Sequence, residues 1–387
     1  MSRARGSGAA RPREVVLVAN DVGGLGGMER QLERLVLGLL AAGRRVTVVA
    51  RTCAVEPREG LRFVRVPGPR RPFTAAYPAF FLLASMLAAR RGDALVHTTG
   101  ALIATRADLS TVHYCHRAAA RTLTAPRARR AGRAYALNAA ISGRLSRAGE
   151  WWAYRPERAR VLCAVSGGLA SELRWGFPAM ASRVRVVPNG VDTAQFRPDP
   201  QARRRVRARL GLAGESRLAL FVGGDWERKG LRHVLDALAQ APGWQLAVAG
   251  DGDAEALLAR AARMGIADRV HVLGASSDLP PLYAAADAFV LPTAYETFSL
   301  VTYEAAAAGL PLLVTRVHGV EDVLEHGRNG WFITPDGAGI AGRLRELEAD
   351  PALAGRMGAA ARSAAAAFSW DAMVERYLEL YDELDAA

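Results

Sequence analysis

The strongest constraint on the fold is a pattern of short apolar runs that alternate with helical stretches and that begins again halfway along the chain. In the first half these runs are "EVVLVAN" from Glu14, "RVTVVA" from Arg45, "ALVHTTG" from Ala94, "LSTVHY" from Leu109, "ARVLCAVS" from Ala159 and "VRVVPNG" from Val184. In the second half they include "LALFVGG" from Leu218 and "AFVLPT" from Ala288. Almost continuously apolar strands separated by helices are typical of a parallel sheet covered on both faces. The sequence therefore predicts an α/β protein with two doubly wound domains.

The boundary between the two halves is predicted in a segment of linker composition. At 387 residues the chain is longer than one hydrophobic core usually supports. The stretch "VPNGVDTAQFRPDP", residues 187–200, is rich in Pro, Asn, Gly and Asp. We therefore expect an N-terminal domain over 1–190, a second domain over 191–367, and a last helix over 368–387. The apolar stripe of that helix needs a surface to pack on, and it contains Trp370, Met373, Val374, Tyr377, Tyr381 and Leu384.

The charge of the chain is strongly positive and is carried almost entirely by arginine. The formal net charge is +13, and Lys229 is the single lysine among 51 basic residues. Such a charge suits nucleic acid or an anionic membrane, although a general preference for arginine at exposed positions explains it equally well. Clusters of arginine therefore carry more information than the total.

Several features indicate a cytoplasmic protein. The three cysteines are far apart and lack metal-ligand spacing, as expected for reduced thiols. The apolar run after the basic N-terminus ends at Asn20 and is too short for an export signal. The longer apolar segment over 73–89 is interrupted by Pro78, so it is predicted to be a buried or interfacial helix rather than a membrane span.

A glycine-rich turn, "NDVGGLGGMERQL", follows the first predicted strand. Such a turn allows close approach of the backbone to a ligand, although it also serves as a purely structural tight turn. A dinucleotide fingerprint fails here because Glu29 stands where its third glycine would be and the second strand ends in Arg51.

The corresponding loop of the second half, "GGDWERKG", places Arg228 beside Lys229 just before a helix. The carboxyl edge of a parallel sheet is where such sheets bind ligands. Two cations at a helix start oppose the helix dipole, and a bound diphosphate would relieve that conflict. A solvated basic turn is the simpler alternative.

Two glutamates flank the start of a later helix in "AYETFSLVTYEAAAAGLPLL". Ser299 is the expected N-cap, Glu304 is placed to accept hydrogen bonds from a ribose diol, and Glu296 is placed to face a sugar. The backbone N–H groups around Leu300 and Val301 would bind a diphosphate. Without the neighbouring strand and small-residue helix, such glutamates would more often be surface residues.

Taken in order, these motifs resemble the family 4 retaining glycosyltransferases of the GT-B fold. The resemblance runs through "GGLGGMER", "VPNGVDTAQFRP", "GGDWERKG", "AGDGD", "ETFSLVTYEAAAAGLP" and "HGRNGWFI". It implies two Rossmann-like domains facing a central cleft, with the last helix crossing back to the N-terminal domain. The adjacent Arg228-Lys229-Gly230 is nearest to lipopolysaccharide core glucosyltransferase-like members, whereas Glu296 to Val301 lacks the two glycines and the proline that many members have.

The resemblance also implies roles for single residues. Lys229 and Arg228 would bind the diphosphate, Glu304 the ribose and Glu296 the donor sugar. His113 in "STVHYCHRA" matches the family histidine beside that sugar better than His116 does, while a plain loop histidine is the alternative. The remaining residues implied in donor binding are Gly26, Gly27, Phe298, Ser299, Leu300 and Val301.

The co-substrate implied is a nucleoside-diphosphate sugar, a UDP- or GDP-sugar, without metal or other cofactor. The acceptor is expected to be a glycan or a lipid-linked molecule of the cell envelope. From Arg121 to Arg160 the chain has ten arginines interleaved with Trp151, Trp152 and Tyr154, which suits an anionic membrane surface or single-stranded nucleic acid. We expect a membrane-bound or otherwise anionic acceptor, with a plain solvated helix as the alternative. The expected location is cytoplasmic, and membrane binding through this stretch would make the protein peripheral on the inner face of the cell membrane. A sugar-nucleotide epimerase of the same fold and a basic nucleic-acid-binding protein are the rival hypotheses.

Overall fold

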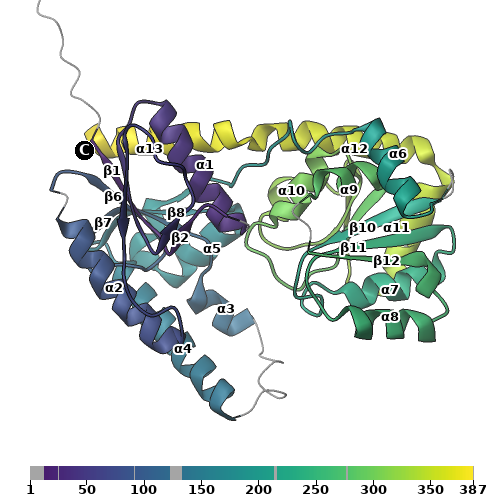
Figure 1. Cartoon of the computed structure of the whole chain (residues 1–387), viewed down its shortest axis with the longest axis horizontal. Coiled ribbons are helices and arrows are strands. Elements are labelled where there is room, and N and C mark those ends of the chain that lie inside the picture. The colour runs from purple at the N-terminus through teal and green to yellow at the C-terminus, as the bar shows by residue number, and fades with distance from the viewer. Residues whose placement is uncertain are drawn as a thin grey trace, which may run out of the picture. The chain divides into compact units, whose positions relative to one another are not determined.

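The computed structural model describes residues 13–24, 26–90, 92–122, 133–212, 216–275 and 278–386 (Figure 1). The chain forms two compact units. The first contains Met1–Ala164, Glu172–Val187 and Val374–Ala387, and the second contains Val165–Ser171 and Pro188–Met373.

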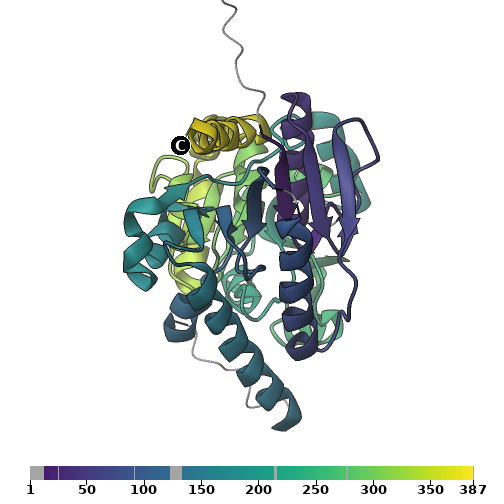
Figure 2. The ribbon, with the colours of Figure 1, turned by 90° about the vertical axis from the view of Figure 1, so that its left-hand side faces the viewer.

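The first unit is built on a sheet of seven parallel strands in the order β5-β3-β1-β6-β7-β8-β9 (Figure 2). The strands are β1 (Val15–Val18), β3 (Val46–Ala50), β5 (Leu61–Arg65), β6 (Leu95–Thr99), β7 (Ala107–Val112), β8 (Ala159–Ala164) and β9 (Val184–Val186). A separate short pair is formed by β2 (Asp21–Val22) and β4 (Thr52–Cys53). The helices are α1 (Gly27–Ala41), α2 (Phe73–Ala89), α3 (His116–Thr122), α4 (Arg133–Ala153) and α5 (Gly167–Gly176). All residues of β1 are fully buried, as near-continuous apolar strands require.

The second unit repeats this architecture with six parallel strands in the order β12-β11-β10-β13-β14-β15. They are β10 (Arg217–Val222), β11 (Trp244–Ala249), β12 (Val270–Gly274), β13 (Ala288–Leu291), β14 (Leu312–Thr315) and β15 (Gly330–Ile333). The helices are α6 (Pro200–Arg209), α7 (Leu231–Gln240), α8 (Ala254–Arg263), α9 (Pro280–Ala285), α10 (Leu300–Ala307), α11 (Gly337–Ala349) and α12 (Pro351–Ala365). Trp244, Phe221 and Phe289 are among its fully buried side chains. The predicted α/β class with two doubly wound parallel sheets is confirmed.

The last helix, α13 (Trp370–Ala386), packs on the first unit from Val374 onward. Ser369 is its N-cap, because its Oγ accepts a hydrogen bond from the N–H of Ala372 at 3.1 Å. The tyrosines of the stripe are fully buried. The predicted return of this helix to the N-terminal domain is confirmed.

A buried polar chain fixes α13 to the sheet. His97 Nδ1 lies 2.6 Å from the hydroxyl of Tyr381, and His97 Nε2 lies 2.8 Å from Thr111 Oγ1. The same Thr111 oxygen lies 2.9 Å from the hydroxyl of Tyr377. Arg44 adds an ion pair to Asp385 at 2.9 Å. Because each of these buried polar atoms has a partner only when the helix is in this position, the hydrogen-bond network specifies where α13 packs.

Replacing Tyr381 by phenylalanine should destabilise the first unit by about 1–3 kcal/mol, because the fully buried His97 loses the hydroxyl partner of its Nδ1. Urea unfolding followed by circular dichroism measures the change. Phe63→Tyr, which changes a hydroxyl at an exposed ring of the same unit, is the control and should be near neutral. Equal stability of the two variants would contradict the role of the hydroxyl.

Candidate functional site

The carboxyl ends of two neighbouring strands position the predicted donor residues in the second unit. β10 pairs with β13 in parallel, so the loops that leave them, 223–230 and 292–299, meet at one edge of the sheet. The first of these loops leads into α7 and the second into α10. The order of strands therefore brings together segments that lie far apart in sequence.

Three of the predicted residues converge at this edge. Arg228 Nη1 lies 3.3 Å from Glu296 Oε1, and Lys229 Nζ lies 3.5 Å from the same oxygen. Thr293 donates its hydroxyl to that oxygen at 3.2 Å. Arg228 Nε also donates to Asp225 Oδ2 at 3.0 Å. Two cations thus share one carboxylate oxygen, and each keeps further N–H donors for an anionic ligand.

The lysine side chain lies directly against a glycine. A Cβ built on Gly223 would come within 2.6 Å of both Cδ and Nζ of Lys229, and the lysine side chain is 12% exposed. Gly223 has φ +140°, a conformation that side-chain-bearing residues rarely adopt. The absence of a side chain at Gly223 therefore leaves the space that the alkyl chain and the ammonium group of Lys229 occupy.

Unusual backbone conformations also gather in these loops. Asp225 (φ 53°) and Ser299 (φ 54°) are the non-glycine residues with positive φ in the described part of the chain. Such conformations cost free energy and occur often at ligand sites. Asp225 lies in the β10–α7 loop and Ser299 lies immediately before α10.

Ser299 does not act as the side-chain cap that the sequence predicts. Its positive φ turns the side chain to Thr302, and the two hydroxyl oxygens lie 2.8 Å apart in a buried position. No hydrogen bond runs from the Ser299 side chain to the first-turn N–H groups at Leu300 and Val301. These amides thus keep their donors available to another acceptor.

Glu304 is buried on α10, 1% exposed, and accepts a hydrogen bond from the hydroxyl of Tyr283 at 2.9 Å. Phe298 is also buried, and its ring stacks on Tyr303 with centroids 4.2 Å apart. Sequence reasoning missed Tyr283, which lies on α9 and gives no local signal. Its hydroxyl holds one carboxylate oxygen of Glu304 in place.

The other predicted residues belong to the first unit. Gly27 begins α1, and Gly26 precedes it with Glu29 packed so closely that a Cβ on Gly26 would overlap the carboxylate. His113 directly follows β7, and β7 neighbours β6, which neighbours β1. A cavity of about 200 Å³ lies at the carboxyl ends of these strands. Its lining includes Asn20, Phe73, Tyr77, Thr99, His113, His116, Glu150 and Tyr154.

A buried carboxylate closes this cavity. Glu150 on α4 is 2% exposed, and its two oxygens accept hydrogen bonds from the N–H groups of His116 at 2.6 Å and Arg117 at 3.0 Å. Burial raises the pKa of Glu150 to about 7, although both N–H groups oppose the shift. Burial lowers the pKa of His113 to about 4, and its Nε2 is buried without a hydrogen-bond partner. His113 is therefore a neutral imidazole at pH 7.

Sequence reasoning did not single out Glu150, which lies in the arginine-rich stretch over 121–160. The one sequence signal for Glu150 is that it is the first acidic residue of α4 after the acid-free residues 133–149. The contact depends on tertiary packing, because Glu150 lies 34 residues from His116.

The raised pKa of Glu150 gives a testable pH dependence. In the folded chain Glu150 keeps its proton to higher pH than in the unfolded chain, where its pKa is near 4.5. Stability of the wild type relative to Glu150→Gln should therefore fall as the pH rises from about 4.5 to 7. Urea unfolding of both proteins at pH 5 and pH 8 measures the difference. A constant difference would contradict the shift.

The predicted arginine-rich surface over 121–160 is only partly described, since 123–132 lies outside the described residues. Two of its aromatic residues, Trp152 and Tyr154, pack within the unit, whereas Trp151 is 59% exposed. Tyr154 is 3% exposed, and Trp152 donates its indole N–H to Ala104 O at 3.0 Å. Arg155 stacks on Trp151 with its guanidinium carbon 3.4 Å from the ring centroid.

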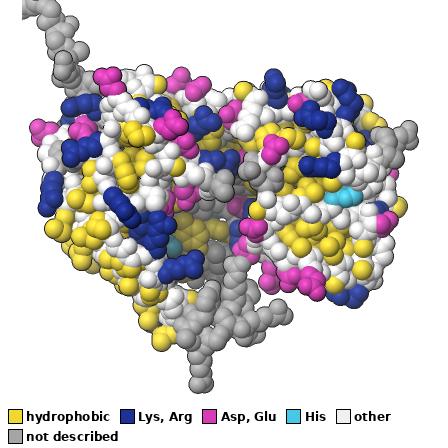
Figure 3. Space-filling view, viewed as in Figure 1, with side chains coloured by type: hydrophobic (Ala, Val, Ile, Leu, Met, Phe, Trp, Pro, Cys, Tyr) yellow, Lys and Arg dark blue, Asp and Glu magenta, His cyan; other side chains and the backbone are white. Residues whose placement is uncertain are grey.

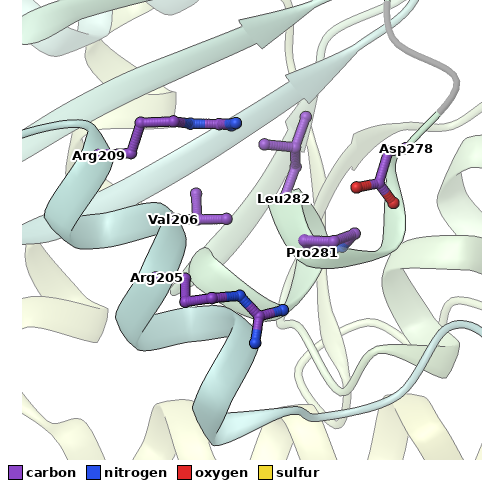
Figure 4. Close-up of a pocket in the computed structure, with 6 residues that line it drawn as sticks. All are labelled: Arg205, Val206, Arg209, Asp278, Pro281 and Leu282. Atoms are coloured by element: carbon purple, nitrogen blue, oxygen red, sulfur yellow. The ribbon is translucent and has the colours of Figure 1, made fainter.

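A cavity of about 270 Å³ in the second unit lies between α6 and α9 (Figure 4). Arg205 and Arg209 line it from α6, and Asp278 and Pro281 lie across from them. None of the residues lining it was predicted as a site residue. The size of a cavity therefore does not locate the candidate site in this unit.

Both halves of the chain match known protein families. Residues 25–195 match the model described as Glycosyltransferase Family 4, and residues 202–364 match Glycosyl transferases group 1. A D-inositol 3-phosphate glycosyltransferase of Corynebacterium jeikeium is 35% identical over 228 residues, 55% of this chain and 54% of that protein. A glycogen synthase of Mycobacterium tuberculosis is 34% identical over 253 residues, 62% of this chain and 58% of that protein. The chain thus spans about half the length of the curated relatives it matches.

Solved structures match nearly the whole chain. A sucrose-phosphate synthase from Thermosynechococcus elongatus has a TM-score of 0.77 at 25% identity and covers 97% of this chain and 99% of its own. WaaG, a glycosyltransferase involved in lipopolysaccharide biosynthesis, has a TM-score of 0.78 at 20% identity, covering 96% of this chain and 100% of its own. The likeness to WaaG concerns the fold, so it does not assign the lipopolysaccharide-core subtype.

Proposed function

We propose that this chain, whose two domains are those of a GT-B glycosyltransferase, moves a sugar with retention of configuration from a UDP- or GDP-sugar to a hydroxyl group. The acceptor is a glycan, a glycolipid or another cell-envelope molecule, and the reaction needs no metal. The observation that carries the proposal is the convergence of Arg228 and Lys229 on Glu296 at the carboxyl edge of the second sheet.

The proposed mechanism places positive charge where negative charge develops. As the bond to the anomeric carbon breaks, the leaving diphosphate gains charge, which Lys229 and Arg228 stabilise. Glu296 accepts hydrogen bonds from hydroxyls of the donor sugar and orients both cations through its shared oxygen. Glu304, held by Tyr283, accepts from the ribose. His113, which the family resemblance implies lies beside the donor sugar, is a neutral imidazole and would act there as a hydrogen-bonding group rather than as a cation.

A uridine donor is the first to test. The Anabaena protein HepE, solved in complex with UDP-glucose, has a TM-score of 0.69 to this chain at 17% identity. The experiment incubates the protein with UDP-, GDP- and ADP-sugars, with and without a lipid extract, and follows nucleotide release and product mass. Release of the diphosphate with a glycosylated product supports the proposal.

Other outcomes of the same assay separate the rival hypotheses. Conversion of the donor sugar to its epimer without transfer would favour the epimerase. No turnover, together with filter binding of DNA or RNA that weakens steeply with salt, would favour a nucleic-acid-binding protein.

A further inference from the structure

The outer face of α2 is apolar although it is exposed. Leu82 is 60% exposed and Met86 is 56% exposed. The exposed residues of the helix are Phe73, Ala75, Leu82, Met86 and Ala89. The helix contains no Asp, Glu, Lys, Arg or His. Since a surface helix normally presents charged or polar residues to water, this outer face requires another explanation.

The neighbouring helix α4 also has exposed apolar side chains. α2 contacts α4, and the hydroxyl of Tyr77 on α2 lies where a Cβ of Gly149 on α4 would be. Leu137 on α4 is 62% exposed, and Ile141, one turn later, is 37% exposed. Figure 3 shows hydrophobic side chains gathered on this lower side of the first unit, with basic side chains beside them.

The charged residues on the exposed part of α4 and directly after α2 are arginines, and the nearest exposed acid is Asp93, beyond the end of α2. Arg90 follows α2, and Arg144 and Arg147 are exposed on α4. Residues 133–149 contain no acid, and Glu150 is buried. An apolar helix face bordered by arginine is typical of a helix that lies in the plane of an anionic membrane surface.

We propose that α2, assisted by the exposed part of α4, docks the first unit on an anionic lipid bilayer. Leu82 and Met86 enter the boundary between headgroups and acyl chains, while Arg90, Arg144 and Arg147 contact lipid phosphates. No helix in the described part of the chain is long and apolar enough to cross a bilayer, and α2 itself is 17 residues long with Pro78 inside it. The helix therefore lies on the membrane.

An anionic bilayer fits this surface better than a second copy of the chain. In a symmetric dimer each partner presents the same patch to the other, so arginines would face arginines. A lipid surface supplies both the apolar phase and the opposite charge. The proposal concerns binding alone and stands independently of the transfer reaction, because vesicle binding needs neither donor nor acceptor.

Vesicle co-sedimentation of the full chain tests the proposal. The probes are phosphatidylcholine vesicles and vesicles that also contain phosphatidylglycerol. Wild type should bind the anionic vesicles and lose binding at high salt. The double variant Leu82→Gln/Met86→Gln should bind at least about tenfold more weakly, because it removes two apolar side chains that would leave water on binding. Leu258→Gln, at an exposed leucine of α8 in the second unit, should bind as wild type.

Three results would overturn the proposal: no binding of wild type to anionic vesicles, equal binding of the double variant, or a dimer in solution that the double variant dissociates. Light scattering after size exclusion measures the last of these. Circular dichroism melting checks that each variant is folded. Arg144→Gln/Arg147→Gln should weaken binding to anionic vesicles and reduce its salt dependence, and an unchanged salt dependence would remove the arginines from the proposed surface.

Discussion

Lys229→Ala should lower kcat by about a hundredfold or more, the usual effect of losing one group that stabilises developing charge. Lys229→Arg should lower kcat by at least about tenfold, because the positive charge is kept but displaced from the position of the ammonium. The alanine variant loses the ammonium that lies beside Glu296. The arginine variant keeps the charge, but its wider guanidinium would have to fit where the lysine side chain already packs against Gly223. Initial rates with the donor found in the nucleotide-sugar panel measure both effects.

Arg328→Ala is the matched control for this pair. Arg328 is also basic and lies in the second unit, but its side chain is 70% exposed and pairs with Glu325 at the surface. Its removal should leave kcat and donor affinity unchanged. Wild-type turnover in Lys229→Arg would mean that the single lysine reflects composition rather than the geometry of the loop.

The alternation of apolar strands and helices predicted most of the fold because each buried parallel strand leaves a clear local signal. The apolar segment over 73–89 forms α2 with the same bounds. Strand β5 (Leu61–Arg65) was not predicted, since it lies at the edge of its sheet and much of it is exposed, so its sequence is not continuously apolar. Strand β15 (Gly330–Ile333) is likewise an edge strand of four residues.

The residues of the candidate site were likewise predicted where they have a local sequence signal and missed where they do not. The loops with Lys229 and Glu296 were predicted because each loop combines charged residues with the start of a helix within a few residues, and the Lys229 loop also contains glycines. Glu150 and Tyr283 were missed because each contacts its partner across a gap in sequence that only packing closes. Ser299 is the N-cap residue of α10 as predicted, but its side chain makes no capping hydrogen bond, because residue type alone does not reveal a positive φ. The grouping of Val165–Ser171 with the second unit had no sequence signal either.

Glu296→Gln should separate donor binding from turnover. The amide keeps the shape of the side chain but removes the negative charge that Arg228 and Lys229 share at 3.3 and 3.5 Å. Both cations then become freer to pair with phosphate oxygens, so the affinity for the nucleoside diphosphate should stay unchanged or increase. Turnover should fall about a hundredfold, because the sugar loses a charged acceptor that orients it in the transition state.

Isothermal titration with the diphosphate and initial rates measure the two parts of this prediction. Glu346→Gln is the control, since Glu346 pairs with Arg343 at 2.8 Å on the surface of α11 and should affect neither quantity. Lys229→Ala should weaken binding and turnover together, whereas Glu296→Gln should lower turnover without weakening diphosphate binding. If Glu296→Gln instead weakened diphosphate binding and left kcat unchanged, Glu296 would support the structure of the loop and would not contact the sugar.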